Sequence, residues 1–181
     1  MTPEGFELFD TAIGRCAIAW GPSGIIGLKL PERNDGAMRA RLRTLHSGMQ
    51  EMTAPHEVQA VVVDIQRLLT GQTRDLSTVS LDMSRVPEFD RQVYIETRSI
   101  PPGETLTYGD IATRLGDVGL SRAVGQALGR NPFAIIVPCH RVVAAAGKSG
   151  GFSAVGGVET KRRLLEIEGA RALHPVLPWD R

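Results

Sequence analysis

The residues best suited to chemistry in this 181-residue sequence stand next to one another: Cys139, His140 and Arg141. They follow a short apolar run, residues 135–137, and Pro138. A thiol beside an imidazole and a guanidinium is in surroundings that favour the thiolate, the nucleophilic form of cysteine. A cysteine at the end of an apolar run is more often an inert core residue, but two cationic neighbours weaken that interpretation. The triplet therefore predicts a nucleophilic cysteine.

The relation between Cys139 and His140 depends on the local backbone. Adjacent residues of an extended chain point to opposite faces, so the imidazole can act on the thiol only if the chain turns or a water molecule bridges them. Pro138 favours a turn at this point.

The other cysteine, Cys16, alternates with Ile18 and Trp20 and is predicted to be a buried, inert thiol. Two cysteines so far apart fit neither a disulfide framework nor a CxxC metal site. No run approaches the roughly 18 apolar residues of a membrane span. The first ten residues lack the basic start and long apolar stretch of a secretory signal. We therefore expect a cytoplasmic protein.

The net charge of +1 excludes no class of partner, but its distribution is uneven. No acidic residue stands between Asp117 and Glu159. A segment without acidic residues can present a positive face to a polyanion, although an ordinary solvated face explains the charges equally well. The basic residues of this segment are Arg122, Arg130, Arg141 and Lys148.

The elements that position the triplet include two short helices with the outline of a helix-turn-helix. Thr107 is placed as the N-cap of a helix over residues 108–115, and Ser121 as the N-cap of a helix over residues 122–129. A helix over residues 89–98 precedes them. Alone, this outline is a weak signal, because many helical pairs look alike.

The second of these helices has an outer face almost without side chains. A glycine inside a helix costs about 1 kcal/mol relative to alanine. Close packing against another helix or close approach to a bulky partner such as a DNA groove would explain the small residues, and the sequence does not choose between them. The residues of this outer face are Ala123, Gly125, Gln126 and Gly129.

The N-terminal half reads as a small antiparallel sheet with helices. Alternating apolar residues predict a meander of three strands over residues 6–9, 15–20 and 26–30. Apolar residues at helical spacing predict a short helix over residues 38–45 and a clearer one over residues 57–69. Residues 76–81 fit either a strand or a linking segment.

Several motifs in fixed order resemble the O6-alkylguanine-DNA alkyltransferases, also called methylated-DNA–protein-cysteine methyltransferases. The most specific is the string from Pro138 to Val142, Pro-Cys-His-Arg-Val. It is preceded by Thr107-Tyr108, by Ser-Arg-Ala-Val-Gly at residues 121–125 and by Asn131-Pro132, and followed by Leu-Leu-Glu-Ile-Glu-Gly at residues 164–169. The resemblance covers residues 89–169.

The resemblance implies a catalytic role for each matching position. Cys139 would accept the alkyl group, His140 would take its proton through a bridging water, and Glu168 would orient that histidine. Asn131 would hold the turn between the recognition helix and the active-site segment. Tyr108 would help to rotate the target nucleotide out of the duplex and donate a proton toward the departing guanine.

The resemblance also implies contacts to DNA and to the extruded base. Arg122 would enter the duplex in place of that base, and Ser153 would contact the guanine O6 side. The other expected DNA contacts are Thr107, Ala123, Gly125, Gln126, Arg130 and Arg141. The expected walls of the base pocket are Tyr108, Val137, Pro138, Phe152 and Ser153.

The implied function is DNA repair by irreversible, stoichiometric transfer of a methyl or other alkyl group from O6-alkylguanine in double-stranded DNA, with O4-alkylthymine left open. No cofactor and no metal are expected, since the zinc ligands of the human member's N-terminal domain are lacking. The loop before Ser153 is longer than in the vertebrate pattern. We expect a monomer without membrane contact, and cooperative assembly along DNA stays open.

The main alternative is a non-catalytic, alkyltransferase-like protein that only binds the lesion, although such proteins replace the acceptor cysteine. A helix-turn-helix regulator would usually add a dimerisation or sensor module, and an unrelated thiol hydrolase or redox enzyme would leave Arg122 and Tyr108 without a role.

The implied fold is α/β. A ribonuclease-H-like domain over residues 1–84 would precede a winged-helix-like, mainly helical domain over residues 85–170 that carries the DNA-binding and alkyl-transfer sites. A C-terminal extension, residues 171–181, has no functional interpretation.

Overall fold

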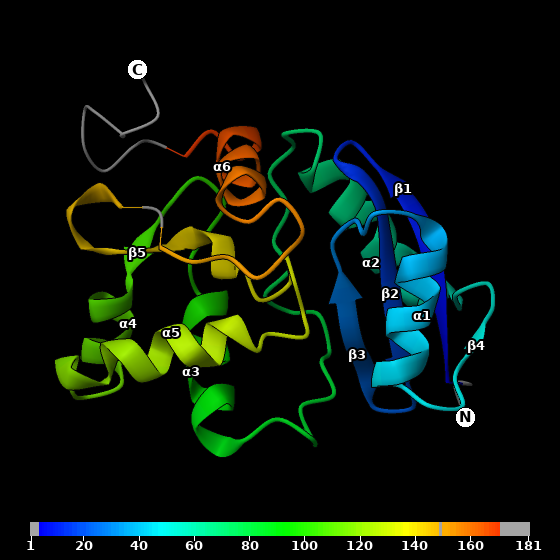
Figure 1. Ribbon diagram of the computed structural model, residues 1–181, viewed down its shortest axis with the longest axis horizontal. Coiled ribbons are helices and arrows are strands. Elements are labelled where there is room, and N and C mark those ends of the chain that lie inside the picture. The colour runs from blue at the N-terminus through cyan, green and yellow to red at the C-terminus, as the bar shows by residue number, and fades with distance from the viewer. Residues whose placement is uncertain (1–3, 149, 171–181) are drawn as a thin grey trace. The chain divides into compact units, whose positions relative to one another are not determined.

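The structure is a computed structural model that describes residues 4–148 and 150–170 (Figure 1). The chain divides into two compact units, residues 1–85 with 132–136 and residues 86–131 with 137–181. The division after residue 85 lies one residue from the boundary expected from the sequence, whereas the return of residues 132–136 to the first unit was not expected. The expected C-terminal extension, residues 171–181, lies outside the described residues.

The first unit is built on a four-stranded sheet with the order β3-β2-β1-β4. The strands β1 (Gly5–Thr11), β2 (Gly14–Gly21) and β3 (Gly24–Lys29) form an antiparallel meander, as the alternating pattern predicted. The short strand β4 (Gln50–Glu51) pairs with β1 in parallel. Residues 132–136 join this unit at β3, where the backbone N–H of Leu28 donates to the Pro132 carbonyl over 2.9 Å.

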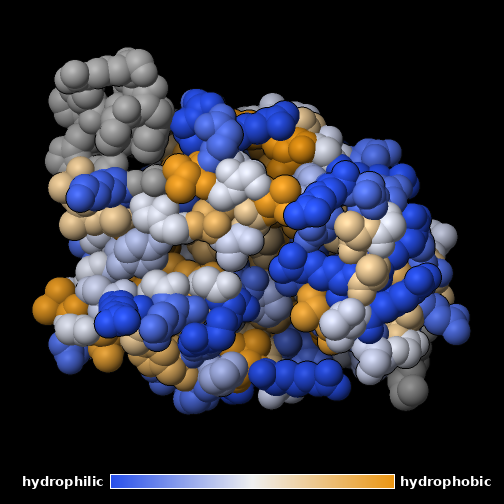
Figure 2. All heavy atoms as spheres, viewed as in Figure 1, coloured by the Kyte–Doolittle hydropathy of each residue, from blue (hydrophilic) through white to orange (hydrophobic). Residues whose placement is uncertain are grey.

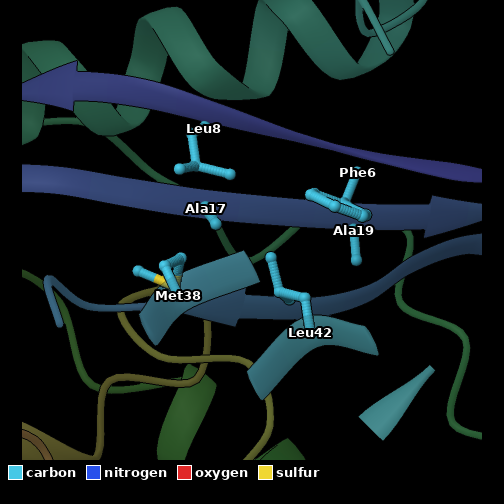
Figure 3. Close-up of a cluster of buried hydrophobic side chains, with 6 residues drawn as sticks. All are labelled: Phe6, Leu8, Ala17, Ala19, Met38 and Leu42. Atoms are coloured by element: carbon cyan, nitrogen blue, oxygen red, sulfur yellow. The ribbon is translucent and has the colours of Figure 1, made fainter. Parts of the chain in front are cut away.

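One face of this sheet packs against helix α1 (Asp35–Leu45). Directly paired residues of β1 and β2 share this face and contact the helix through their side chains (Figure 3). The cluster consists of Phe6, Leu8, Ala17, Ala19, Met38 and Leu42. Asn34 caps the helix by accepting a hydrogen bond from the N–H of Ala37, which satisfies one of the free donors at a helix start.

The opposite face of the sheet carries the residues of β2 that alternate with Ala17 and Ala19. Helix α2 (His56–Leu68) lies on this side, where Gln59 donates to the Glu7 carboxylate over 2.9 Å. Its buried stripe has the helical spacing predicted for residues 57–69. Cys16 is fully buried, as predicted, and burial raises the pKa of its thiol to about 12, which disfavours the nucleophilic thiolate.

The segment over residues 76–81 is a link rather than a strand. Only its last residue, Leu81, forms an isolated bridge, to Ile25 of β3. No helix within the described part of the chain has both the length and the apolar character that crossing a membrane requires.

The second unit is mainly helical and carries all the expected catalytic positions. It contains α3 (Glu88–Arg98), α4 (Tyr108–Arg114), α5 (Ser121–Gly129) and α6 (Val158–Ile167). The strands β5 (Leu106–Thr107) and β6 (Val142–Val143) pair in parallel. Short 3-10 helices occupy Val118–Leu120, Cys139–Arg141 and Ala145–Gly147.

The two predicted helix starts have different outcomes. Thr107 caps α4 as predicted, and Asp110 completes a capping box by accepting from the Thr107 N–H over 2.7 Å. The prediction that Ser121 is an N-cap is wrong, because the 3-10 turn Val118–Leu120 runs directly into α5 and makes Ser121 its first residue. The Ser121 hydroxyl donates back to the Val118 carbonyl instead.

Candidate active site

The reactive triplet lies on a tight turn and not on an extended strand. Residues Cys139–Arg141 form a single 3-10 turn, closed by the Arg141 N–H donating to the Pro138 carbonyl over 2.8 Å. The Asn131 amide donates to the Val137 carbonyl over 2.8 Å, which ties the end of α5 to the entrance of the turn. The turn that Pro138 predicted is therefore present, and it removes the geometric objection to cooperation between Cys139 and His140.

His140 is held by a buried carboxylate. Its ring Nε2 lies 2.9 Å from Oε1 of Glu168, and the imidazole is 1% exposed. Burial lowers the pKa of His140, although the neighbouring Glu168 acts in the opposite direction, so the ring is neutral near pH 7. A neutral imidazole whose Nε2 faces a carboxylate carries its proton on that nitrogen.

The other ring nitrogen of His140 is free to accept a proton. Nδ1 is buried and has no hydrogen-bond partner among the described residues. A buried polar atom without a partner is rare and costly in a native protein, and an ordered water is one of the usual ways of satisfying it. The orphaned nitrogen belongs to the residue next to Cys139, so it is suited to receive the thiol proton through such a water.

Arg141 is part of the same buried network. Its guanidinium donates twice to Glu168, over 2.9 and 2.7 Å, and once to the Ile100 carbonyl over 2.6 Å. Burial alone would raise the pKa of Glu168, but His140 and Arg141 outweigh it and hold that pKa at about 2. The structure gives no support for the expected contact of the Arg141 side chain with DNA, because the guanidinium is inside the protein and three of its donors are used there.

The resting cysteine is a thiol. Burial raises the pKa of Cys139, and a hydrogen bond from Asn131 and the positive charge of Lys161 only partly reverse that effect. Cys139 is nevertheless half-buried rather than sealed, and it lines a cavity. The side chain is therefore accessible but needs a base to become a nucleophile.

The cavity beside Cys139 has a volume of about 600 Å³. It brings together residues from α4, α5, the Cys139 turn and the loop before α6, all of them in the second unit. Four expected pocket or catalytic residues meet here, together with three of the expected DNA contacts. The lining residues are Tyr108, Ser121, Arg122, Gly125, Gln126, Leu128, Gly129, Cys139, Gly151, Phe152 and Ser153.

Other expected positions lie elsewhere. Val137 and Pro138 are buried and do not line the cavity, so their expected role as pocket walls is not supported. Thr107 is engaged as the cap of α4. Arg130 is exposed, but its guanidinium is held by two hydrogen bonds to the buried carboxylate of Asp90, over 2.8 and 3.0 Å.

Tyr108 begins α4 and forms one wall of the cavity. Burial raises the pKa of its hydroxyl, as does the proximity of Cys139, so the phenol stays protonated and can donate. A side chain at Gly150 would place its Cβ 2.5 Å from the Tyr108 hydroxyl, and the backbone there has φ +70°, so glycine keeps the space for that hydroxyl.

The small residues of α5 are not explained by packing within the described part of the chain. A Cβ built at Gly125 would meet the Tyr108 ring only at 3.8 Å, an ordinary contact, and a Cβ at Gly129 would meet nothing within 4 Å. Two glycines inside the helix cost about 1 kcal/mol each relative to alanine, and no internal contact compensates for this cost. The open face is left available to a partner.

Lys161 was not among the residues expected from the sequence to belong to the site. This lysine lies on the buried face of α6, three residues before the buried Leu164 and seven before Glu168, and it is fully buried. Its position on an apolar stripe was the available signal. Among the described residues, no group of three or more His, Cys, Asp or Glu side chains is placed to hold a metal ion.

Comparison with known proteins decides the family. A model described as "6-O-methylguanine DNA methyltransferase, DNA binding domain" matches residues 88–170. The methylated-DNA–protein-cysteine methyltransferase of Mycobacterium tuberculosis is 51% identical over 167 residues, covering 92% of this chain and 93% of that protein. This chain belongs to the methylated-DNA–protein-cysteine methyltransferase family.

A more distant relative and a solved structure support the same family. The methylated-DNA–protein-cysteine methyltransferase of Methanothermobacter thermautotrophicus is 34% identical over 152 residues, covering 84% of this chain and 78% of that protein. A crystal structure of Mycobacterium tuberculosis OGT in complex with DNA matches with a TM-score of 0.76 at 34% identity, covering 93% of this chain and 96% of that one. The α/β fold with a sheet first and a helical DNA-binding domain second is that of the family, as predicted.

The activity is that of the family as well. The chain is an alkyltransferase that repairs O6-methylguanine in DNA directly, by moving the alkyl group to a cysteine of its own. The prediction of function from the Pro-Cys-His-Arg-Val string is confirmed at this level.

Proposed function

We propose that Cys139 is the cysteine that accepts the alkyl group, and that each molecule reacts once. The observation that carries this assignment is the cavity beside Cys139, next to a histidine whose Nδ1 has no hydrogen-bond partner in the part of the chain that the structure describes. Cys16, the other cysteine of the chain, is fully buried in the first unit and has a pKa of about 12.

The reaction begins with removal of the thiol proton. His140 accepts it on Nδ1 through a bridging water, and Glu168 stabilises the resulting imidazolium at Nε2. The thiolate attacks the alkyl carbon, a C–S bond forms, and the C–O6 bond breaks with its electron pair leaving on guanine. Tyr108 donates toward the base as this charge develops, which a carboxylate at the same position would oppose. The product is a thioether that no neighbouring group can hydrolyse, so the transfer is stoichiometric.

Double-stranded DNA is the proposed partner, and α5 is the helix proposed to contact it. The target carbon lies inside the base stack, so the nucleotide has to leave the duplex at a cost of a few kcal/mol. Arg122 lines the cavity at the start of α5 and is placed to fill the vacated position, while the open face of the same helix allows close approach to a groove. The Mycobacterium tuberculosis relative has been solved in complex with DNA.

The surface over α5 is mixed in polarity and carries little free positive charge. Over the part of the molecule where Figure 1 shows α5, Figure 2 shows hydrophilic and hydrophobic side chains interspersed rather than a continuous apolar patch. Of the four basic residues in the segment without acidic residues, Arg141 is buried and Arg130 is paired to Asp90. The affinity for DNA should therefore fall only slightly as the salt concentration rises. A monomer acting in the cytoplasm is part of the same proposal.

A direct experiment tests the assignment. Duplex DNA with a labelled O6-methylguanine is incubated with the wild-type protein, with Cys139→Ser and with the matched control Cys16→Ser. We expect one methyl group per molecule on the peptide that contains Cys139, in the wild type and in Cys16→Ser only. Label on Cys16, or more than one turnover per molecule, would contradict the proposal.

A further inference from the structure

Lys161 is a buried cation to which the reaction described above gives no role. Its side chain on α6 is fully buried, although an unpaired ammonium is among the most expensive groups to remove from water. Nζ donates to the Val142 carbonyl over 2.5 Å and lies 5.8 Å from the centre of the Tyr108 ring. Among the described residues, no carboxylate lies within ion-pair distance of it.

The charges around Lys161 leave it without a permanent counter-ion. Glu168 is negative, but Arg141 balances it with two hydrogen bonds. His140 is neutral because burial lowers its pKa, and Tyr108 is neutral because burial raises its pKa. Among the described residues, the remaining group that can become an anion and acts on the Lys161 charge is Cys139.

The interaction between the two groups is mutual. The positive charge of Lys161 lowers the pKa of Cys139, and Cys139 raises that of Lys161. Burial dominates for the lysine and brings its pKa to about 8. Thermodynamic linkage requires the two effects to be equal in free energy, so a change in one group is reported by the other.

We propose that Lys161 is the counter-ion of the Cys139 thiolate that forms during the reaction. Lys161 acts through Cys139 as a positioning residue and touches no reacting carbon. While the thiolate exists, the pair is neutral overall. When the sulfur electron pair forms the C–S bond and guanine leaves with the electron pair of the C–O bond, a neutral thioether replaces the anion, and Lys161 is again without a counter-ion, as it is beside the resting thiol.

This inference rests on Cys139 being the acceptor, but its test does not need DNA. Iodoacetamide converts a thiolate to a neutral thioether, and mass spectrometry maps the modified peptide. The pH dependence of this rate gives the pKa of Cys139 directly. In Lys161→Met we expect modification at pH 7, where Lys161 is charged, to slow about tenfold, which corresponds to about one pKa unit of lost thiolate stabilisation. Lys161→Arg should restore most of the rate if the residue acts through its charge.

A second measurement follows the charge of Lys161 itself. The chain has three lysines, Lys29, Lys148 and Lys161, so their side-chain NMR signals can be assigned one by one, and the Lys161 signal gives the pH at which this lysine loses its charge. The resting Cys139 is a thiol in this pH range, so the stabilisation of its thiolate depends on whether Lys161 is still protonated. We expect the rate advantage of the wild-type protein over Lys161→Met to shrink as the pH rises through the Lys161 titration, near pH 8.

The outcomes separate this inference from the proposed function. If iodoacetamide modifies a folded Lys161→Met variant as fast as the wild-type protein at pH 7, the counter-ion role is refuted, even if methyl transfer from DNA proceeds. If Lys161→Met slows the iodoacetamide reaction but methyl from DNA is found elsewhere, the coupling stands and Cys139 is not the acceptor. A rate advantage of the wild-type protein that does not change across the Lys161 titration would also overturn the proposal.

Discussion

Glu168 binds His140, the proposed base, and we expect the same carboxylate to stabilise the second unit. Replacing Glu168 with glutamine measures its contribution to the free energy of unfolding. The carboxylate is 3% exposed and has a pKa of about 2, against an ordinary value of 4.5. This difference of about 2.5, at about 1.4 kcal/mol for each pKa unit, corresponds to about 3 kcal/mol of folding free energy at pH 7. Loss of one partner from a buried ion pair, here with Arg141, gives a similar cost of about 3–5 kcal/mol.

The sign of the pH dependence follows from the lowered pKa. The folded state holds Glu168 ionised more strongly than the unfolded state does, so its contribution is complete above pH 4.5 and is lost as the pH falls toward 2. Glu168→Gln should therefore be about 3 kcal/mol less stable than wild type at pH 7, with a gap that narrows below pH 4.5.

Urea unfolding of both proteins between pH 7 and pH 3, followed by circular dichroism, measures the gap. Glu159→Gln is the matched control, because Glu159 lies on the same helix in an exposed pair with Arg162 and should change little. A Glu168→Gln variant within about 0.5 kcal/mol of wild type at pH 7, inside the range of ordinary surface substitutions, would show that the network does not stabilise the fold.

The remaining predictions concern the reaction and are measured by single-turnover rates and by binding. Arg122→Ala should slow repair of duplex DNA much more than reaction with free O6-benzylguanine, since a free base has no stack to leave; equal losses would reduce the arginine to a phosphate contact. Tyr108→Phe should slow both substrates by about 10²–10⁴-fold, because general-acid assistance is lost in either case; an effect on the duplex alone would assign Tyr108 to extrusion only. Cys139→Ser should still bind modified duplex in a gel-shift titration, and disappearance of binding from a folded variant would show that the cysteine belongs to the binding surface.

Local patterns predicted most of the elements that build the site. The capping box at Thr107 and Asp110 involves neighbours in sequence, so it was readable without knowledge of the fold. Pro138 likewise indicated the turn at Cys139. In both cases the physical cause lies within a few residues.

The failures involve contacts over long stretches of chain. Arg141 was expected at the surface, yet its partners are Glu168 and the Ile100 carbonyl, 27 and 41 residues away. Lys161 was overlooked because periodicity shows which face a residue occupies but not whether a cation on that face has been buried. The surroundings of the Arg141 and Lys161 side chains are set by residues far away in the sequence, so they could be seen only in the tertiary structure.

Helix α5 shows how the fold accommodates a recognition surface that weakens its own helix. Gly125 and Gly129 lower its intrinsic stability and make no close contact that an added Cβ would disturb. The helix is instead held from α3, where the Tyr94 hydroxyl donates to the Ala127 carbonyl over 2.9 Å and Asp90 binds Arg130. These bonds secure the C-terminal end of α5, so the face toward the cavity needs no bulky side chains to stay in place. A helix fixed by its neighbours can leave its outer face bare for the partner it is proposed to read.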